Sequence, residues 1–274
     1  MTEPIYQRPD DYDLEHEGRD EDIDCLVRLI RARRPKRVLE LGAGSGRLAI
    51  PLARVGARES FDVVGLEPAE EMRNAAAQKL ESETDQVRKR LTLEAGDMRS
   101  WRAAKPFEVI VCADSSVSHL LTLEDQLATW RTAFRNLRPD GLFIVDIVMP
   151  QLFAYADSMQ TPPRSIVEID LDAADPETGT RLLRYKTTRY QPHEQRASIR
   201  FLYDKFTAGS TEQPVRSVSD FESHVYFPRE LQLLYLCAGF VVDAVFGDYR
   251  PRPLRETSRQ MIAVGRRPAE SHAG

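Results

Sequence analysis

The chain has 274 residues, of which 42% are hydrophobic, and its formal net charge at pH 7 is −5. This length and composition suit a globular protein with a packed core, built as one large domain or two small ones. The calculated pI of 5.7 argues against a broad phosphate-binding surface, so we expect no nucleic-acid partner.

Neither targeting signals nor metal motifs stand out. The N-terminal stretch 1–18 is acidic without the apolar centre of a signal peptide, and no apolar run reaches membrane-spanning length. We therefore expect a cytoplasmic protein that does not bind membranes. Cys25, Cys112 and Cys237 lie far apart in apolar contexts without metal-ligand spacing. Their odd number argues against a disulfide framework, so we expect buried free thiols and no metal.

Polar residues dominate the first part of the chain. Residues 1–19 contain two prolines and predict an extended arm or a short helix. The side chains of Tyr6, Tyr12 and Arg19 suggest that this arm covers another part of the protein rather than forming a free tail. From Asp20 the apolar residues follow helical spacing, and this helix should end before the Arg-Pro pair at 34–35.

A glycine-rich loop follows that helix. The apolar run 38–41 predicts a buried strand that leads directly into Gly42, Gly44 and Gly46, after which helical spacing resumes. Glycines allow a sharp turn and a close ligand approach, and the amides that open the helix point at the ligand. The third glycine comes one residue earlier than in the dinucleotide fingerprint, and Glu40 precedes the first glycine by two positions. A dinucleotide site and a structural turn remain alternatives for the loop alone.

Two further strands end in acidic residues. The strand 61–66 is followed by Glu67 and Pro68, where a carboxylate can accept both hydroxyls of a ribose, although a solvated helix start is the alternative. The segment 91–98 ends in Asp97 and Met98, which without further context would be an ordinary turn.

The fourth and fifth strands complete an alternating pattern. The strand 107–113 precedes Asp114 and His119, and Thr122 with Asp125 predicts a capping box at the start of a helix. We expect residues 139–141 to stop that helix and 142–148 to form the fifth strand. Strands that alternate with helices imply a parallel sheet with helices on both faces.

The pattern changes after Pro150. Runs with short-period alternation predict antiparallel strands at 181–190, 198–206 and 221–227. Afterwards a helix from Pro228 and two strands, 241–246 and 261–265, return to the earlier pattern. The antiparallel strands are thus expected to be an insert in an α/β fold.

Taken in order, the motifs LELGAGSG, GLEP, EAGDM and FEVIVCADSSVSHLL resemble those of class I S-adenosylmethionine (SAM) methyltransferases of the small-molecule branch. The segment SSVSHL and the N-terminal Tyr12 and Arg19 are similar to the bacterial amino-sugar N,N-dimethyltransferases, with a weaker likeness to glycine and sarcosine N-methyltransferases. The resemblance implies a Rossmann-like, mostly parallel sheet of seven strands with its last strand antiparallel, and an inserted antiparallel β lid. It further implies four regions: a cofactor-covering arm and helix (1–36), a SAM-binding core (37–150), a lid or acceptor insert (151–226) and a C-terminal completion of the sheet (227–268).

The resemblance also assigns cofactor contacts. In this assignment Gly42, Gly44 and Gly46 face the methionine part of SAM, and Glu40 holds its amino group. Glu67 with Pro68 contacts the ribose, and Asp97 with Met98 contacts the adenine. Tyr12 and Arg19 close over the cofactor. Asp114 is a further candidate that contacts the cofactor or an amine.

Methyl transfer to an amine or hydroxyl is helped by a base near neutral pKa, and His119 is the first candidate because it follows the fourth strand. The alternative is a histidine that binds a loop carbonyl or only shapes the pocket. Further pocket candidates, for which a solvated sheet face is the alternative, are Tyr6, Tyr185, Arg200, Tyr203, His224 and Tyr226.

The resulting hypothesis is a SAM-dependent methyltransferase that methylates a small-molecule acceptor, most simply an amine, in bacterial secondary metabolism. The alternatives are methylation of oxygen, carbon or sulfur, a SAM-binding or nucleotide-binding regulatory protein, and a nicotinamide-dependent oxidoreductase. Exposed strands in the insert could also pair two subunits into a homodimer.

Overall fold

The computed structural model describes residues 5–160, 162, 164–209 and 213–269. These residues form two compact units. The core unit consists of Asp20–Pro150 and the chain from Tyr226 onward, and the sheet unit consists of the chain before Asp20 together with Gln151–Val225. Residues 5–19 thus belong to the sheet unit, whereas the helix α2 (Glu21–Ala32) that follows them belongs to the core unit.

A seven-stranded sheet in the order β10-β11-β5-β4-β1-β2-β3 forms the centre of the core unit. Among the described strands of this sheet, β11 alone runs opposite to the other six, which agrees with the expected seven-stranded sheet with its last strand reversed. The strands are β1 (Arg37–Leu41), β2 (Asp62–Leu66), β3 (Leu91–Glu94), β4 (Phe107–Cys112), β5 (Leu137–Val148), β10 (Val241–Phe246) and β11 (Gln260–Arg266).

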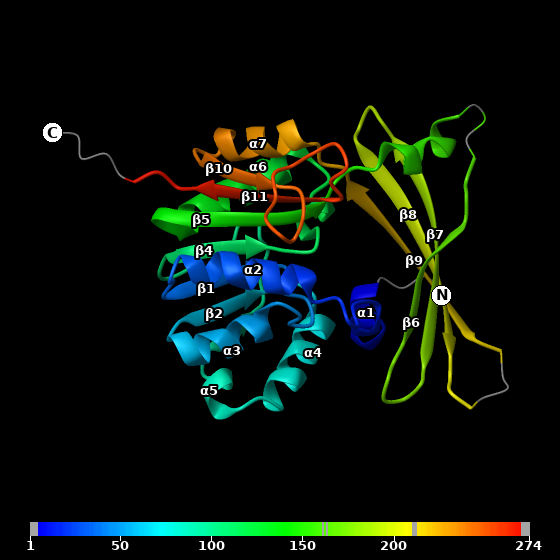
Figure 1. The fold of residues 1–274 in the computed structure, drawn as a ribbon, viewed down its shortest axis with the longest axis horizontal. Helices are drawn as coiled ribbons and strands as arrows, with labels where there is room; N and C mark the ends of the chain where they lie inside the picture. Colours follow the sequence, from blue (N-terminus) through cyan, green and yellow to red (C-terminus); the bar gives the residue numbers. More distant parts are fainter. Residues whose placement is uncertain (1–4, 161, 163, 210–212, 270–274) are drawn as a thin grey trace. The chain divides into compact units, whose positions relative to one another are not determined.

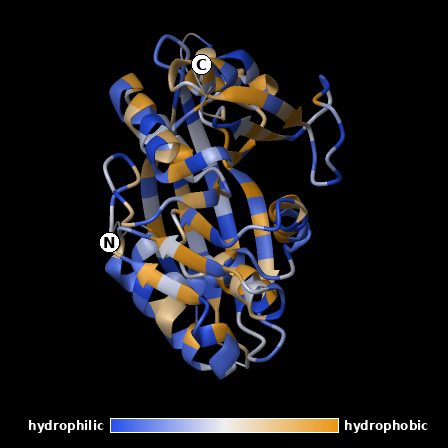
Figure 2. Ribbon diagram, turned by 90° about the vertical axis from the view of Figure 1, so that its left-hand side faces the viewer, coloured by the Kyte–Doolittle hydropathy of each residue, from blue (hydrophilic) through white to orange (hydrophobic). Residues whose placement is uncertain are grey.

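Helices cover both faces of this sheet (Figure 1). Side chains alternate across a strand, so in β1 Val38 packs with helices α2 and α3, whereas Leu39 packs with α6 and α7. The central strands are apolar along most of their length, as the orange segments in Figure 2 show. The helices of the core unit are α2 (Glu21–Ala32), α3 (Ala49–Glu59), α4 (Glu70–Glu81), α5 (Asp85–Arg88), the 3-10 turn η2 (Ser116–His119), α6 (Leu123–Asn136) and α7 (Pro228–Cys237).

The junction between α6 and β5 differs from the prediction. Thr122 caps α6 as expected, since its side-chain oxygen accepts the Asp125 amide at 3.1 Å. The helix, however, ends at Asn136, and the strand begins at Leu137 rather than at 142. Leu137 is buried and pairs with Phe107 of β4, so the strand begins there, ahead of the exposed residues 138–140 whose sequence looks like a turn.

The sheet unit contains four antiparallel strands in sequential order: β6 (Glu168–Ala174), β7 (Arg181–Gln191), β8 (Arg196–Phe206) and β9 (Val215–His224). The predictions for β7 and β8 are close to the observed bounds. The run predicted at 221–227 is misplaced, because β9 begins at Val215 and ends at His224, and β6 was not predicted. β6 alternates acidic and apolar residues but is largely exposed, and polar residues make up most of β9, so neither strand forms the apolar run that is typical of a buried strand.

The N-terminal residues form η1 (Ile5–Gln7) and α1 (Pro9–Glu15), which pack on one face of this sheet. Two further 3-10 turns of the unit, η3 (Leu152–Tyr155) and η4 (Asp157–Met159), precede β6 in the chain. Ile5 packs with Leu182 and Tyr203 in a small apolar cluster. Ion pairs complete the attachment: Lys205 bonds Asp11 at 2.8 Å, and Arg184 contacts Glu15 at 3.0 Å. The arm is therefore a short helix, one of the two predicted alternatives.

The cysteine prediction is wrong at one position. Cys25 and Cys112 are buried, but Cys237 is exposed because it ends α7 on the solvent side. In the part of the chain that the structure describes, no helix has the length and apolarity needed to cross a bilayer.

Candidate functional site

The loops after β1 and β2 are bonded to each other at the carboxyl edge of the core sheet. The amides of Gly42 and Ala43 donate to the Leu66 carbonyl at 2.8 and 3.0 Å. The Gly44 amide donates to Oε2 of Glu67 at 2.9 Å. The first glycine loop and the acid at the tip of β2 therefore form one structural element, although 23 positions separate Gly44 from Glu67.

Two more segments reach the same place. Gly42 has a φ of +74°, and a Cβ built on it would lie 2.9 Å from Oγ of Ser116 and 3.6 Å from Cε of Met98. Ser116 opens η2 beyond β4, and Met98 follows β3. Only glycine fits this backbone conformation and this close approach. The ends of β1, β2, β3 and β4 thus meet around Gly42.

Glu67 is a buried carboxylate with capacity for further donors. Besides the Gly44 amide on Oε2, it accepts the Ala69 amide on Oε1 at 2.9 Å. Each carboxylate oxygen can accept two hydrogen bonds, so one position remains on each. Arg73 donates to the carbonyls of Glu67 and Pro68 at 2.8 and 2.7 Å, which fixes the turn that carries the carboxylate.

Glu40 lies at the end of β1, 3% exposed. Burial raises the pKa of its carboxyl well above the ordinary value, with a further increase from the nearby charge of Glu67, while Arg47 and the Ala49 amide oppose the change. Its Oε2 atom has no hydrogen-bond partner among the described residues. A buried oxygen without a donor is destabilising, so a ligand that donates a proton or brings a positive charge would be favoured there.

Asp97, the residue assigned to adenine, is part of an ion pair that the sequence did not predict. Arg99 donates to both of its carboxylate oxygens at 2.9 Å through Nε, and it also bonds Asp125 at 3.0 Å. The hydrogen bonds from Arg99 lower the pKa of Asp97, so this carboxylate stays ionised. Arg99 orients the carboxylate while leaving it half-buried at the strand end.

A second ion pair links the glycine loop to α2. Arg47 donates to Oδ1 of Asp22 at 3.1 Å, and its guanidinium lies 3.9 Å from Oδ2 of Asp114. Asp114 directly follows β4 and has a φ of 48°. Asp22 was missed because a charged residue in the first turn of a helix is normally explained by the helix dipole.

His119 ends η2, four residues after Ser115, and is exposed. Nearby protein atoms disfavour the charged imidazolium and lower its pKa below the ordinary 6.5. At neutral pH the side chain is therefore mainly neutral and able to accept a proton.

The predicted residues of the sheet unit are divided between its two faces. Alternation along the paired strands places Tyr185, Arg200 and His224 on one face and Tyr203 on the other, where Tyr203 is covered by the N-terminal arm. Tyr12 belongs to that arm and stacks on His16 with ring centroids 4.3 Å apart. The remaining two arm candidates also lie in this unit: Tyr6 beside Tyr12, and Arg19 exposed at its end.

Tyr226 requires a correction, because it does not continue the strand face of Glu222 and His224. β9 ends at His224, and Tyr226 belongs to the core unit, where it is 2% exposed. Its hydroxyl donates to the Val117 carbonyl at 3.0 Å and its ring packs against Trp130. Both ends of the side chain are thus occupied by core contacts.

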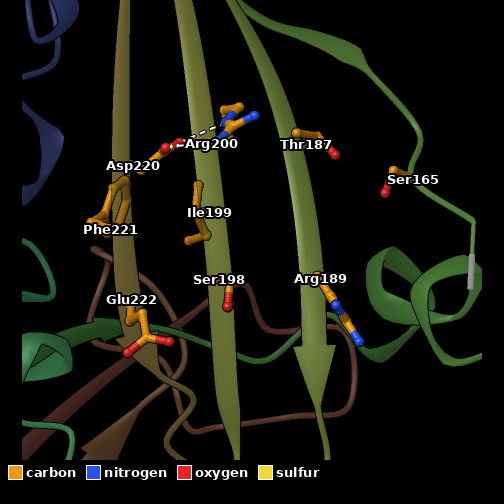
Figure 3. A pocket seen from close by; sticks show the side chains of 9 residues that line it. All are labelled: Ser165, Thr187, Arg189, Ser198, Ile199, Arg200, Asp220, Phe221 and Glu222. Carbon is orange, nitrogen blue, oxygen red and sulfur yellow. Dashed lines mark hydrogen bonds and ion pairs between the residues drawn. The ribbon is translucent and has the colours of Figure 1, made fainter. Parts of the chain in front are cut away.

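An open cavity of about 440 Å³ lies on the sheet unit (Figure 3). Arg200 and Asp220 face each other across β8 and β9 and form a bidentate ion pair at 2.7 and 2.9 Å. Thr187 and Arg189 of β7 line the cavity from the neighbouring strand. Its lining combines both charge signs with hydroxyl groups, which does not select one ligand class.

Among the described residues, no group of three or more histidine, cysteine or acidic side chains could hold a metal ion.

Comparison with known proteins adds to this geometry. A family model described as a methyltransferase domain matches residues 38–141, the segment that carries the glycine loop, Glu67 and Asp97. Over this segment the chain is similar to a methyltransferase domain, in agreement with the resemblance expected from the motifs.

Curated relatives of this chain include two bacterial proteins. YqeM of Bacillus subtilis (strain 168), a methyltransferase by name, is 31% identical over 45% of this chain and 48% of its own length. The dTDP-3-amino-3,4,6-trideoxy-alpha-D-glucopyranose N,N-dimethyltransferase of Streptomyces venezuelae is 28% identical over 63% of this chain and 78% of its own. The chain thus spans about half the length of the first relative and more of the second.

Solved structures show the same fold over nearly the whole chain. DesVI of Streptomyces venezuelae has a TM-score of 0.71 at 22% identity, covering 95% of this chain and 96% of DesVI. CalS10, a SAM-bound amino pentose methyltransferase from Micromonospora echinaspora, has a TM-score of 0.67 at 19% identity, covering 97% and 98%. The methyltransferase fold therefore includes both units.

Proposed function

We propose that this chain is a SAM-dependent methyltransferase that transfers a methyl group to the amino nitrogen of a small, sugar-like acceptor. The observation that carries the proposal is the carboxylate of Glu67, which is bonded to the Gly44 amide and retains one acceptor position on each oxygen. That arrangement suits the two hydroxyls of a ribose beside a glycine loop. The amino-sugar enzymes among the relatives support the acceptor class.

The residues at the carboxyl edge fit SAM in two further ways. Gly42 lets Ser116 pack directly against the loop, because a Cβ at this position would collide with the Ser116 hydroxyl, so the ends of β1 and β4 lie close enough to contact one ligand. Glu40 provides a buried oxygen without a donor, which suits the ammonium group of the methionine part. In this proposal Gly44 and Gly46 lie along the methionine part, Glu67 holds the ribose, and Asp97 and Met98 hold the adenine.

Acidic and basic side chains both gather at this edge of the sheet. Glu67, Asp22 and Asp114 bring carboxylates, and the cations beside them are Arg47, Arg73 on the Glu67 carbonyl and Lys79 on the Ser45 carbonyl. Burial raises the pKa of Glu40 and disfavours its charged form. The amine acceptor is therefore supported by the amino-sugar enzymes among the relatives and not by an excess of one charge.

Bound SAM would supply an electrophilic methyl group, which the acceptor's lone pair would attack in line with the methyl–sulfur bond, with S-adenosylhomocysteine as the leaving group. The chain's own contribution is chiefly to hold acceptor and cofactor in that line, and such positioning can remove up to roughly 7–11 kcal/mol of a barrier. The attacking nitrogen must first be neutral. His119, held mainly neutral by its lowered pKa, accepts the proton, and Asp114 offers a carboxylate to the ammonium form.

The roles of the flanking regions belong to the same proposal. We infer that residues 1–36, with Tyr12 and Arg19, contribute to cofactor binding and that residues 151–226 contribute to acceptor choice. The solved relatives support this only through their shared fold.

Calorimetry with SAM and S-adenosylhomocysteine tests the proposal on the purified full chain. We expect binding to the wild type and binding weakened at least about tenfold by Glu67→Ala, because two hydrogen bonds to a charged group are lost, each worth about 1.5–3 kcal/mol. Glu71→Ala, an exposed acid in the first turn of α4, is the matched control and should bind normally.

Absence of heat with either compound in the wild type would refute the cofactor assignment. Mass spectrometry then tests the acceptor, using dTDP-linked amino sugars beside the corresponding hydroxy sugars. Methylation confined to the hydroxy sugars would contradict the amine assignment while leaving SAM binding intact.

A further inference from the structure

The turn after β4 has an unusual backbone. Asp114 and Ser115 are consecutive residues other than glycine, and their φ angles are 48° and 61°. Side chains with a Cβ rarely adopt such values, and they persist only where surrounding contacts impose them. Because this turn carries Asp114 and leads into η2 with His119, whatever holds the turn also sets the position of both groups.

β5 supplies the contacts that hold the turn. Oδ2 of Asp146 accepts the Asp114 amide at 3.4 Å, and the Asp146 carbonyl accepts the Ser115 amide at 3.0 Å. The Val148 amide in turn donates to Oγ of Ser115 at 3.1 Å. One buried side chain and two backbone groups of β5 therefore define the turn.

An aspartate is an unexpected residue at position 146. It lies within the buried part of β5 between Val145 and Ile147, and it is only 1% exposed. Burying a carboxyl is unfavourable, and an apolar residue would pack equally well in the strand. Its Oδ1 atom has no hydrogen-bond partner among the described residues. Strand packing alone does not explain this side chain.

Charged and titratable groups from every neighbouring segment affect this carboxyl. Burial raises the pKa of Asp146 to about 7, and the charges of Asp114 after β4 and Asp22 of α2 add to this increase. The hydrogen bonds from the Asp114 amide and from the Tyr249 hydroxyl, which donates at 3.4 Å, oppose it. The other such groups nearby are the thiols of Cys25 in α2 and Cys112 in β4, and Arg47, which contacts Asp22 and Asp114.

We propose that Asp146 is a positioning residue for methyl transfer: its carboxylate holds the Asp114–Ser115 turn in the left-handed shape that presents Asp114 and His119 to the acceptor. The inference rests on the proposed function, but it concerns a residue that contacts neither the glycine loop nor Glu67. Proton uptake by Asp146 removes the charge that attracts the Asp114 amide. The turn should then loosen, and acceptor use should fall, as the pH drops below about 7.

Four variants of the full chain separate positioning from general stability. Asp146→Ala removes the acceptor for the Asp114 amide, Asp146→Asn keeps a neutral acceptor, and Tyr249→Phe removes one donor to Oδ2 without changing the turn. Asp243→Asn is the matched control, because Asp243 pairs with Arg266 on the edge strand β10. The acceptor probe is dTDP-3-amino-3,4,6-trideoxyglucose, the sugar in the name of one relative.

Expected results follow from the geometry. The kcat/KM for the acceptor should fall about tenfold or more in Asp146→Ala, which corresponds to one lost hydrogen bond to a charged group. The kcat/KM of Asp146→Asn should lie between those of the wild type and Asp146→Ala, and it should no longer change near pH 7. Tyr249→Phe should shift that change to higher pH, because the Tyr249 hydroxyl lowers the pKa of Asp146. SAM affinity should stay within about twofold of wild type in all four variants, since a global fold defect would reduce both quantities.

Hydrogen exchange gives a readout that does not depend on turnover. The peptide spanning 112–120 should exchange faster in Asp146→Ala, while the peptide spanning 38–50 should be unchanged. The inference fails if Asp146→Asn keeps both the wild-type pH profile and the wild-type exchange of 112–120. It also fails if SAM affinity falls in parallel with acceptor use. Loss of SAM binding by the wild type, by contrast, would refute the proposed function itself.

Discussion

Replacing Asp146 by asparagine should make the stability of the core unit less dependent on pH. The pKa of this carboxyl is about 7 in the folded protein and 3.8 as an unperturbed side chain. Between these values the folded state binds more protons than the unfolded chain, so stability falls as pH rises from about 4 to 7. The stabilising effect is fully present below pH 4 and is lost above pH 7. The difference between the two pKa values corresponds to a change of up to about 4 kcal/mol in the free energy of unfolding.

The assay is urea denaturation of wild type and Asp146→Asn at several pH values between 4 and 8, followed by tryptophan fluorescence. Trp101 and Trp130 are the two tryptophans of the sequence, and both lie in the core unit, so the signal reports that unit alone. Asparagine does not titrate, so effects of the substitution that do not depend on pH cancel in the comparison.

We expect the free energy of unfolding of Asp146→Asn, relative to that of the wild type, to increase from about pH 4 to about pH 7 and to level off above pH 7. Asp243→Asn should run parallel to the wild type. Parallel curves for Asp146→Asn would show that the carboxyl is ionised in the folded protein throughout this range, and the electrostatic reasoning would then be wrong.

Two further substitutions probe the site directly. Gly42→Ala should weaken SAM binding at least about tenfold in calorimetry, because the new Cβ would meet Ser116 and the φ of this residue is +74°. Adding Ser116→Gly removes the clash and should restore part of the affinity, while the loss due to backbone strain of about 1–3 kcal/mol remains. If the double variant shows no recovery, the contact with Ser116 does not explain the loss. His119→Asn should lower kcat and remove an acid limb with a pKa below 6.5 from the pH–rate profile; an unchanged profile would exclude His119 as the base.

The sequence determined the core of the fold because its signals are local. Buried parallel strands are short apolar runs, and the glycines and acids at their ends occupy fixed positions relative to them. Gly42, Gly44 and Glu67 could therefore be placed at one sheet edge from the sequence, and the structure brings all three together. The five strands that alternate with helices follow from the same pattern, whereas the reversed last strand was implied by the family resemblance.

Only the tertiary structure decided the contacts between distant segments. Asp146, Asp22 and Tyr249 carry no motif, and their grouping depends on how β5, α2 and the chain after β10 pack. The Arg99 ion pair with Asp97 likewise follows from side-chain geometry rather than from spacing. β6 and β9 were missed or misplaced because β6 is largely exposed and β9 is mostly polar, so neither strand forms a long apolar run. Burial imprints a pattern on sequence, whereas a polar contact between remote residues does not.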